Sequence, residues 1–102
     1  MKRRSVVLSP EARDDLLTIY DWVAEVASPL VASDYLDRIE TCLRGFDLAS
    51  ECGTLRDDIR PGLRIVGFER RLTIAFTVEE ERVIILRLFQ AGRRWESDFK
   101  ED

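Results

Sequence analysis

The sequence predicts an α+β domain in which one strand and an antiparallel helix hairpin precede a three-stranded antiparallel meander, in the order β-α-α-β-β-β. Three observations support this prediction. Two Ser-Pro pairs mark helix starts, the hydrophobic period falls from 3.6 residues to about two after residue 60, and short polar connections separate the last three apolar runs. Because a chain of 102 residues has the length of one domain and is too short for two independent cores, we expect residues 1–102 to form a single domain.

The first two elements are a short strand and a helix. Residues 5–8 are β-prone and stop at Ser9-Pro10, where Ser9 is a suitable N-cap and Pro10 loses no useful N–H group. Acidic residues follow, including Asp14 and Asp15, and complement the positive end of the helix dipole. The apolar residues that recur at spacings of three and four predict one buried helix face: Ala12, Leu16, Ile19, Tyr20, Val23 and Ala27.

A second helix starts in the same way at Ser28-Pro29, and the short connection makes the two helices antiparallel neighbours. Gly45 lies near its expected C-terminal cap. The predicted buried stripe consists of Ala32, Tyr35, Leu36, Ile39, Leu43 and Phe46. The two helices together therefore present an apolar face that must cover something else.

The sheet follows a turn-rich stretch at residues 49–60. Runs of β-prone residues predict strands at 63–68, 72–78 and 83–89, joined by connections of hairpin length. The middle strand alternates between two faces, Leu72, Ile74, Phe76 and Val78 on one and Arg71, Thr73, Ala75 and Thr77 on the other. We therefore expect this strand to be half exposed.

The charge distribution indicates which partners the chain suits. A net charge of −4 argues against a general nucleic-acid binder, which needs excess positive charge to displace counterions. However, 14 of the 16 basic residues are arginine, and the segment from Arg56 to Arg94 holds nine arginines against six acidic residues. Arginine suits bidentate recognition of carboxylates or phosphates, although solvated strand faces explain any single arginine equally well.

Metal, cofactor and membrane roles are not indicated. The chain has no histidine, and Cys42 and Cys52 lack metal-ligand spacing, so we expect reduced thiols, no metal and no cofactor. Basic residues 2–4 precede an apolar stretch of only Val6 to Leu8, which is too short for a signal peptide or a membrane span. We therefore expect a cytoplasmic protein.

Three segments in the same order resemble ParE-type toxins of the RelE/ParE toxin–antitoxin superfamily. Residues 8–23, LSPEARDDLLTIYDWV, resemble the opening of these toxins, and residues 53–64, GTLRDDIRPGLR, resemble their central element. Residues 83–95, which end in Gly92-Arg93-Arg94-Trp95, are similar to their last strand and its exit. The resemblance implies a type II toxin that inhibits DNA gyrase and replication, is neutralised by a ParD-like antitoxin, and meets DNA only indirectly through that antitoxin.

The candidate antitoxin-binding residues are Leu17, Trp22, Arg60, Arg64 and Arg71. Leu17 and Trp22 flank the core stripe of the first helix, and with arginines nearby they suit an amphipathic, acidic partner helix. The alternative is that Trp22 merely edges the core. Arg60 and Arg64 bracket a tight Pro61-Gly62 turn and could clamp a carboxylate or a phosphate, or one of them could pair with a nearby acid to dock the loop.

The candidate target-binding residues are Arg87, Arg93, Arg94 and Trp95, which give the end of the last strand a basic and aromatic character. The alternative is a terminal clasp in which Trp95 folds back on the sheet and the arginines lie in water. We expect this surface, and not an active site, to carry the toxicity.

Catalysis is not expected, because the groups that transfer protons are almost missing. Without histidine the chain would need a perturbed Tyr, Lys, Asp or Glu, and both Tyr20 and Tyr35 fall on predicted core stripes. Gln90 stands where members of the superfamily often have histidine. The principal alternative is a RelE-like ribosome-dependent mRNA endoribonuclease; a regulatory DNA-binding module and an orphan structural domain also remain open.

Overall fold

The structure is a computed structural model that describes residues 4–47 and 52–90. Strand β1 (Ser5–Leu8) precedes helices α1 (Pro10–Val26) and α2 (Pro29–Arg44), and a 3₁₀ turn, Gly45–Asp47, ends the helical part. Strands β2 (Thr54–Leu55), β3 (Leu63–Phe68), β4 (Leu72–Val78) and β5 (Arg82–Gln90) follow. The predicted α+β fold and its order of elements are confirmed, with β2 as an additional short strand.

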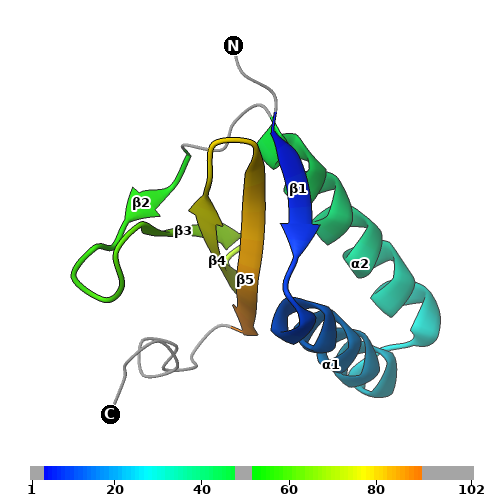
Figure 1. Cartoon of the computed structure of the whole chain (residues 1–102). Helices are drawn as coiled ribbons and strands as arrows, with labels where there is room; N and C mark the ends of the chain where they lie inside the picture. The colour runs from blue at the N-terminus through cyan, green and yellow to red at the C-terminus, as the bar shows by residue number, and fades with distance from the viewer. Residues whose placement is uncertain (1–3, 48–51, 91–102) are drawn as a thin grey trace.

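The strands form one sheet in the order β1-β5-β4-β3-β2, and both helices lie on the same side of it (Figure 1). Strand β1 runs parallel to β5, whereas β2, β3, β4 and β5 pair antiparallel in succession. The register between β4 and β5 shifts after the pair Ala75 and Arg87, because Phe76 faces Ile85 and leaves Leu86 as an extra residue. The predicted three-stranded meander therefore forms the centre of a wider sheet.

Both predicted helix starts are confirmed. The hydroxyl of Ser9 accepts a hydrogen bond from the amide of Ala12 at 3.0 Å, and that of Ser28 accepts one from Val31 at 3.1 Å. The expected stripe of the first helix is wrong at Ala27, which is exposed because it is the C-cap. Gly45 is the C-cap of α2, but its φ of −65° keeps right-handed geometry, so the chain continues into the 3₁₀ turn.

The main core lies between the helices and one face of the sheet. It includes Ile39 of α2, Phe76 of β4 and Ile85 of β5, each with no exposed surface. The rings of Phe46 and Phe76 pack with their centroids 4.8 Å apart. None of the helices in the described part of the chain is both long enough and apolar enough to span a membrane.

The opposite face of the sheet corrects one expectation. Strand β4 is not half exposed, since Ala75 is 0% exposed and packs with Leu63 and Phe89 in a second small cluster. Register explains the burial: β3 places Ile65 beside Ala75 across the antiparallel pair, so neighbouring strands supply the apolar surface. The alternation of residues within one strand does not show which side chains the adjacent strands contribute to the same face of the sheet.

Two tight turns connect the strands. Arg60 and Leu63 close the predicted Pro61-Gly62 turn through a 3.0 Å bond from the Leu63 amide to the Arg60 carbonyl. Between β3 and β4, Glu69 and Arg70 both adopt positive φ, 50° and 59°, as the two central residues of a type I′ turn require. That second turn delivers Arg71 to the end of the sheet beside the helices.

Candidate functional site

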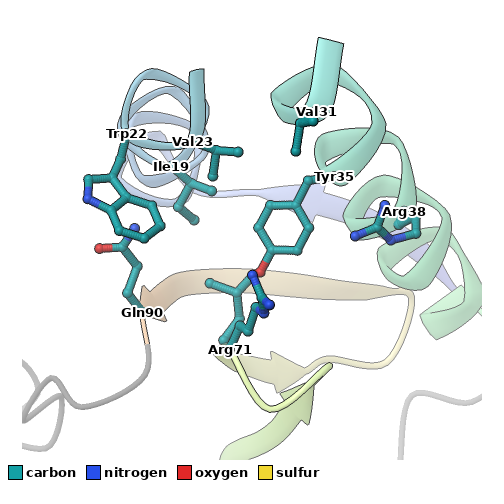
Figure 2. Close-up of a pocket in the computed structure, with 9 residues that line it drawn as sticks. Ile19, Trp22, Val23, Val31, Tyr35, Arg38, Arg71 and Gln90 are labelled. Atoms are coloured by element: carbon teal, nitrogen blue, oxygen red, sulfur yellow. The ribbon is translucent and has the colours of Figure 1, made fainter. Parts of the chain in front are cut away.

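A groove of about 360 Å³ opens between the helix hairpin and the end of the sheet (Figure 2). We call it the hairpin groove. Its lining comes from both helices, the start of β4 and the end of β5: Ile19, Trp22, Val23, Val31, Tyr35, Arg38, Arg71, Leu72 and Gln90. The buried side chains of Ile19, Val23 and Leu72 form its apolar floor, whereas the half-exposed Val31 and the tryptophan, tyrosine, arginine and glutamine side chains complete the lining. This combination of an apolar floor and a few polar groups is typical of a recognition site.

Trp22 is one of the large apolar side chains that remain exposed outside the core. Ile19 and Val23 of α1 are buried against the sheet, while Trp22 remains 53% exposed although it lines the groove. A half-exposed tryptophan beside a concave surface suits an anchor for a partner chain. Trp22 thus lies beside the buried stripe of α1, and its role in binding stays a prediction.

Arg38 and Glu69 form a bidentate ion pair at the edge of the groove. The Arg38 Nε atom lies 2.9 Å from Glu69 Oε2, and its Nη2 atom lies 3.2 Å from Oε1. The guanidinium carbon also sits 5.3 Å from the centroid of the Tyr35 ring. These hydrogen bonds from Arg38 lower the pKa of the Glu69 carboxyl, so it is ionised at neutral pH. The charge of Arg38 is thus already matched by a carboxylate of the same chain.

Arg71 differs from Arg38 because its guanidinium makes no hydrogen bond to Glu69, although its charge helps to lower the pKa of that carboxyl. Within residues 4–47 and 52–90, no hydrogen bond or ion pair involves its side chain, which is exposed. The hydroxyl of Tyr35 points toward Arg71 in Figure 2. Burial, with Glu69 as a secondary cause, raises the pKa of Tyr35, so this hydroxyl keeps its proton at neutral pH. The groove therefore offers two hydrogen-bond donors side by side.

The other antitoxin candidates lie outside the groove. Leu17 is 65% exposed on α1, and Arg60 is exposed in the Pro61-Gly62 turn. Arg64 of β3 borders a separate shallow hollow with Leu55 of β2. The structure thus brings Trp22 and Arg71 together and places the remaining three candidates elsewhere.

The loop before β3 is docked by residues other than Arg60. Arg56 pairs with Asp58 at 2.9 Å, and Asp57 Oδ1 accepts a bond from the Gly62 amide at 2.8 Å. Because the acids beside the turn already have these partners, the Arg60 side chain is left exposed on the turn.

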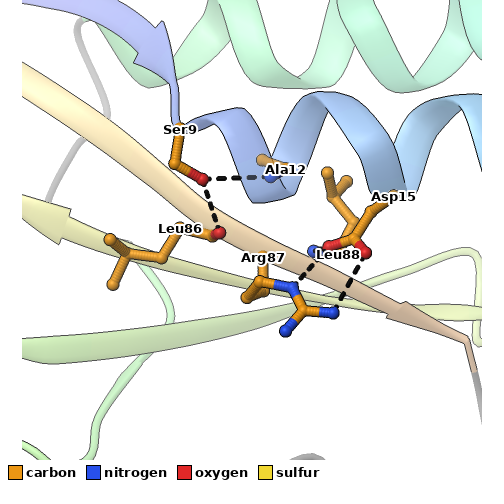
Figure 3. A network of polar contacts seen from close by, with 6 residues as sticks. All are labelled: Ser9, Ala12, Asp15, Leu86, Arg87 and Leu88. Atoms are coloured by element: carbon orange, nitrogen blue, oxygen red, sulfur yellow. Dashed lines mark hydrogen bonds and ion pairs between the residues drawn. The ribbon is translucent and has the colours of Figure 1, made fainter. Parts of the chain in front are cut away.

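Arg87, a target-binding candidate, has a partner within the fold (Figure 3). Its Nε and Nη2 atoms lie 2.8 Å and 3.1 Å from the two carboxylate oxygens of Asp15 on α1. Its guanidinium carbon sits 4.8 Å from the centroid of the Phe89 ring. The other three target-binding candidates, Arg93, Arg94 and Trp95, lie outside the described residues.

The two cysteines are free thiols, each partly buried against the main core. Burial raises the pKa of both Cys42 and Cys52, which makes their reactive thiolate forms scarce at neutral pH. In the described part of the chain, no three His, Cys, Asp or Glu side chains gather in a way that could hold a metal ion.

Sequence reasoning missed three groove residues, namely Tyr35, Arg38 and Gln90, as binding candidates. Helical spacing placed the Tyr35 ring in the core, where it is only 8% exposed, but did not show that its hydroxyl reaches the groove. Arg38 lies three residues after Tyr35, a spacing that puts both on one helix face. This spacing was the only feature of the sequence that could have indicated Arg38 as a groove residue.

Comparison with known proteins places this geometry in a family. The family model described as "ParE toxin of type II toxin-antitoxin system, parDE" matches residues 6–95, a span that contains the whole hairpin groove. A solved structure described as "Chromosomal ParDE TA system from P. aeruginosa" shares the fold with a TM-score of 0.76 and 25% identity. That similarity covers 86% of this chain and 96% of the other. No curated protein matches the chain at a significant level.

Proposed function

Since this chain belongs to the family of ParE toxins of type II toxin–antitoxin systems, we propose that it inhibits DNA gyrase and replication and is neutralised by a ParD-like antitoxin. It acts in the cytoplasm and meets regulatory DNA only through the antitoxin. The observation that carries the proposal is the family match over residues 6–95. The hairpin groove supports the part of the proposal that concerns the antitoxin, because Arg71, which makes no ion pair in the described chain, and the exposed Trp22 line it and suit contact with a partner protein.

The toxin works by binding and not by catalysis. RNA cleavage of the RelE kind needs a base for the attacking 2′-hydroxyl, and the chain contains no histidine. The Tyr35 hydroxyl is a poor base at neutral pH, because its pKa is raised and it holds its proton. Arginine stabilises charge but does not ordinarily accept a proton. These chemical properties support a poison that binds its target.

Purified toxin is expected to trap gyrase on supercoiled plasmid as protein-linked cleavage products and to leave ribosome-bound message uncut. A trapped complex leaves broken DNA, so induction without antitoxin should also stop replication and start a DNA-damage response. Co-expression with the product of the neighbouring open reading frame should restore growth. Message cleavage with gyrase unaffected would replace this function with the RelE-like ribonuclease.

Trp22→Ala is expected to weaken the toxin–antitoxin complex by about 2 kcal/mol, roughly thirtyfold in Kd, because a tryptophan at a groove is a central anchor. The fold should persist, since the side chain is 53% exposed. Val26→Ala is the comparison, because Val26 is 62% exposed on the same helix and does not line the groove. Calorimetric titration of both variants measures the two losses, and unchanged affinity of Trp22→Ala would show that the antitoxin binds elsewhere.

The remaining candidates keep their proposed roles. Leu17, Arg60 and Arg64 belong to the proposed antitoxin contact, Leu17 on the exposed face of α1 and the two arginines as a separate basic area on the turn and β3. Arg87, Arg93, Arg94 and Trp95 are proposed to contact the target. For Arg87 that role would require the Asp15 pair to open or to present its outer surface.

A further inference from the structure

Two neighbouring hydrogen-bond donors line the hairpin groove, the Arg71 guanidinium and the Tyr35 hydroxyl. Neither donates a hydrogen bond to another residue in the described part of the chain. We propose that Arg71 and the Tyr35 hydroxyl form a carboxylate-binding subsite that receives one acidic side chain of the antitoxin, beside an apolar anchor that fills the floor of the groove. This inference rests on the proposed function and specifies the chemistry of the partner. It makes Tyr35 a recognition residue as well as a core residue.

The two arginines of the groove have different roles, Arg38 a structural one and Arg71 a binding one. Arg38 is held by both oxygens of Glu69 and lies over the Tyr35 ring, so it fixes the wall of the groove. Arg71 follows the Glu69-Arg70 turn directly and carries the donors that remain available. An incoming carboxylate therefore meets Arg71 without first breaking an ion pair.

The local geometry holds the subsite in place. The Tyr35 ring packs against Phe68 at 6.2 Å between centroids, and its position in the core fixes where the hydroxyl emerges. The turn restrains the backbone at Arg71, whose amide donates a hydrogen bond to the Phe68 carbonyl at 3.0 Å. A carboxylate that accepts from both side chains makes charge-assisted hydrogen bonds, which are the stronger kind.

The balance of charge favours a single carboxylate over a nucleic acid. Glu69 offsets Arg38, so the groove offers the net charge of one arginine, and the whole chain carries −4. A nucleic-acid backbone would need several unopposed cations along its path and would meet the Glu69 carboxylate at the edge of the groove. Ile19, Val23 and Leu72 form the apolar floor and Val31 adds apolar surface beside it, which fits an aliphatic or aromatic residue and not a phosphate. The occupant is therefore a peptide segment in which an acid lies within about one helical turn of a large apolar residue.

The test compares neighbouring arginines. Arg71→Gln in the full-length toxin should weaken binding of the product of the neighbouring open reading frame by about tenfold or more, whereas Arg70→Gln should change it less than about twofold. Arg70 is a matched control, because it is an exposed arginine next in the chain that does not line the groove. Tyr35→Phe, which keeps the buried ring, should weaken binding about threefold to tenfold.

Paired substitutions locate the acid. Each acidic residue of the antitoxin is changed in turn to its amide, and one of these changes should cost about tenfold against the parent toxin but almost nothing against Arg71→Gln. Equal losses against both toxins at every acidic position would overturn the subsite, as would Arg71→Gln binding as tightly as Arg70→Gln. Arg71-dependent binding of a short single-stranded DNA oligonucleotide would also overturn it, because the subsite would then serve a phosphate.

The result separates the two proposals. If the parent toxin fails to bind the protein encoded by the neighbouring open reading frame, or fails to trap gyrase, the proposed function is wrong. If the parent binds and Arg71→Gln and Tyr35→Phe bind equally well, the function stands and only the subsite is wrong. Circular dichroism of all three toxin variants should match the parent, since Arg71 is exposed and Tyr35→Phe keeps the core ring.

Discussion

Replacing Asp15 with alanine is expected to lower the free energy of unfolding by about 3 kcal/mol, because this carboxylate joins α1 to the edge of β5. Asp15 is 13% exposed and pairs through both oxygens with Arg87, which is 22% exposed. The same carboxylate accepts a 2.9 Å bond from the Leu88 amide. The substitution therefore removes the Asp15 acceptor from a largely buried guanidinium and from the Leu88 N–H. Urea denaturation measures the loss.

Two further variants make the interpretation of Asp15→Ala specific. Asp15→Asn keeps an acceptor for the Leu88 amide but removes the charge, so its loss should lie between the parent and the alanine variant. Asp14→Ala removes an exposed acid from the same turn and should change stability by less than about 0.5 kcal/mol. If Asp15→Ala and Asp14→Ala have equal effects, the attachment of α1 to β5 contributes nothing measurable.

The reason for this attachment lies in the sheet topology. Strand β1 pairs with β5 only as far as Ile85, so the following part of β5 would be an open edge. Ser9 closes it with a 2.7 Å bond from its hydroxyl to the Leu86 carbonyl, and Asp15 closes it at Leu88 (Figure 3). Covering an edge in this way prevents pairing with another chain. Ser9 thus caps α1 and seals the sheet with one hydroxyl group.

Local chemistry made most elements predictable from the sequence. Both Ser-Pro starts, the bounds of β1, β3 and β4, and the tight Pro61-Gly62 turn depend on residues that are neighbours in the chain. The roles of Asp15 and Ala75 were not predictable in this way. Asp15 has its partner 72 residues away, so the sequence showed only an acid near a helix start. Ala75 is buried by residues of other strands, which only the register brings beside it.

The site was less predictable than the fold for the same reason. Helical periodicity identified Trp22 as a side chain left over from the core, and the structure places it at the groove. Arg71 reaches the same groove because it follows the turn between β3 and β4, whereas Arg60 and Arg64 lie on either side of the Pro61-Gly62 turn, and Arg64 borders a separate hollow. Arg38 was not predicted as a site residue because Glu69, which fixes its position, is 31 residues away in the sequence. Residue types suggested an arginine-based site, but packing decided which arginines form it.

Gly53→Ala is expected to lower the free energy of unfolding by about 3 kcal/mol, because this position combines two separate obstacles to a side chain. Its φ is +78°, and a Cβ atom there would lie 2.3 Å from the carbonyl oxygen of Ile65. That oxygen belongs to the backbone of β3, so it cannot rotate away as a flexible side chain would. The added methyl group should push β2 from β3, where Thr54 and Leu55 pair with Ile65 and Arg64.

Gly62→Ala separates the two obstacles, because Gly62 has nearly the same backbone angle, a φ of +79°, in open surroundings. The nearest atom to its added Cβ is the Thr77 hydroxyl oxygen at 3.5 Å, an ordinary contact distance. Gly62→Ala should therefore show only the backbone strain, about 1 kcal/mol. Urea denaturation of both variants gives the difference, which is the cost of the overlap with β3. Equal losses would mean that β2 moves aside freely and that Gly53 is required only for its backbone angle.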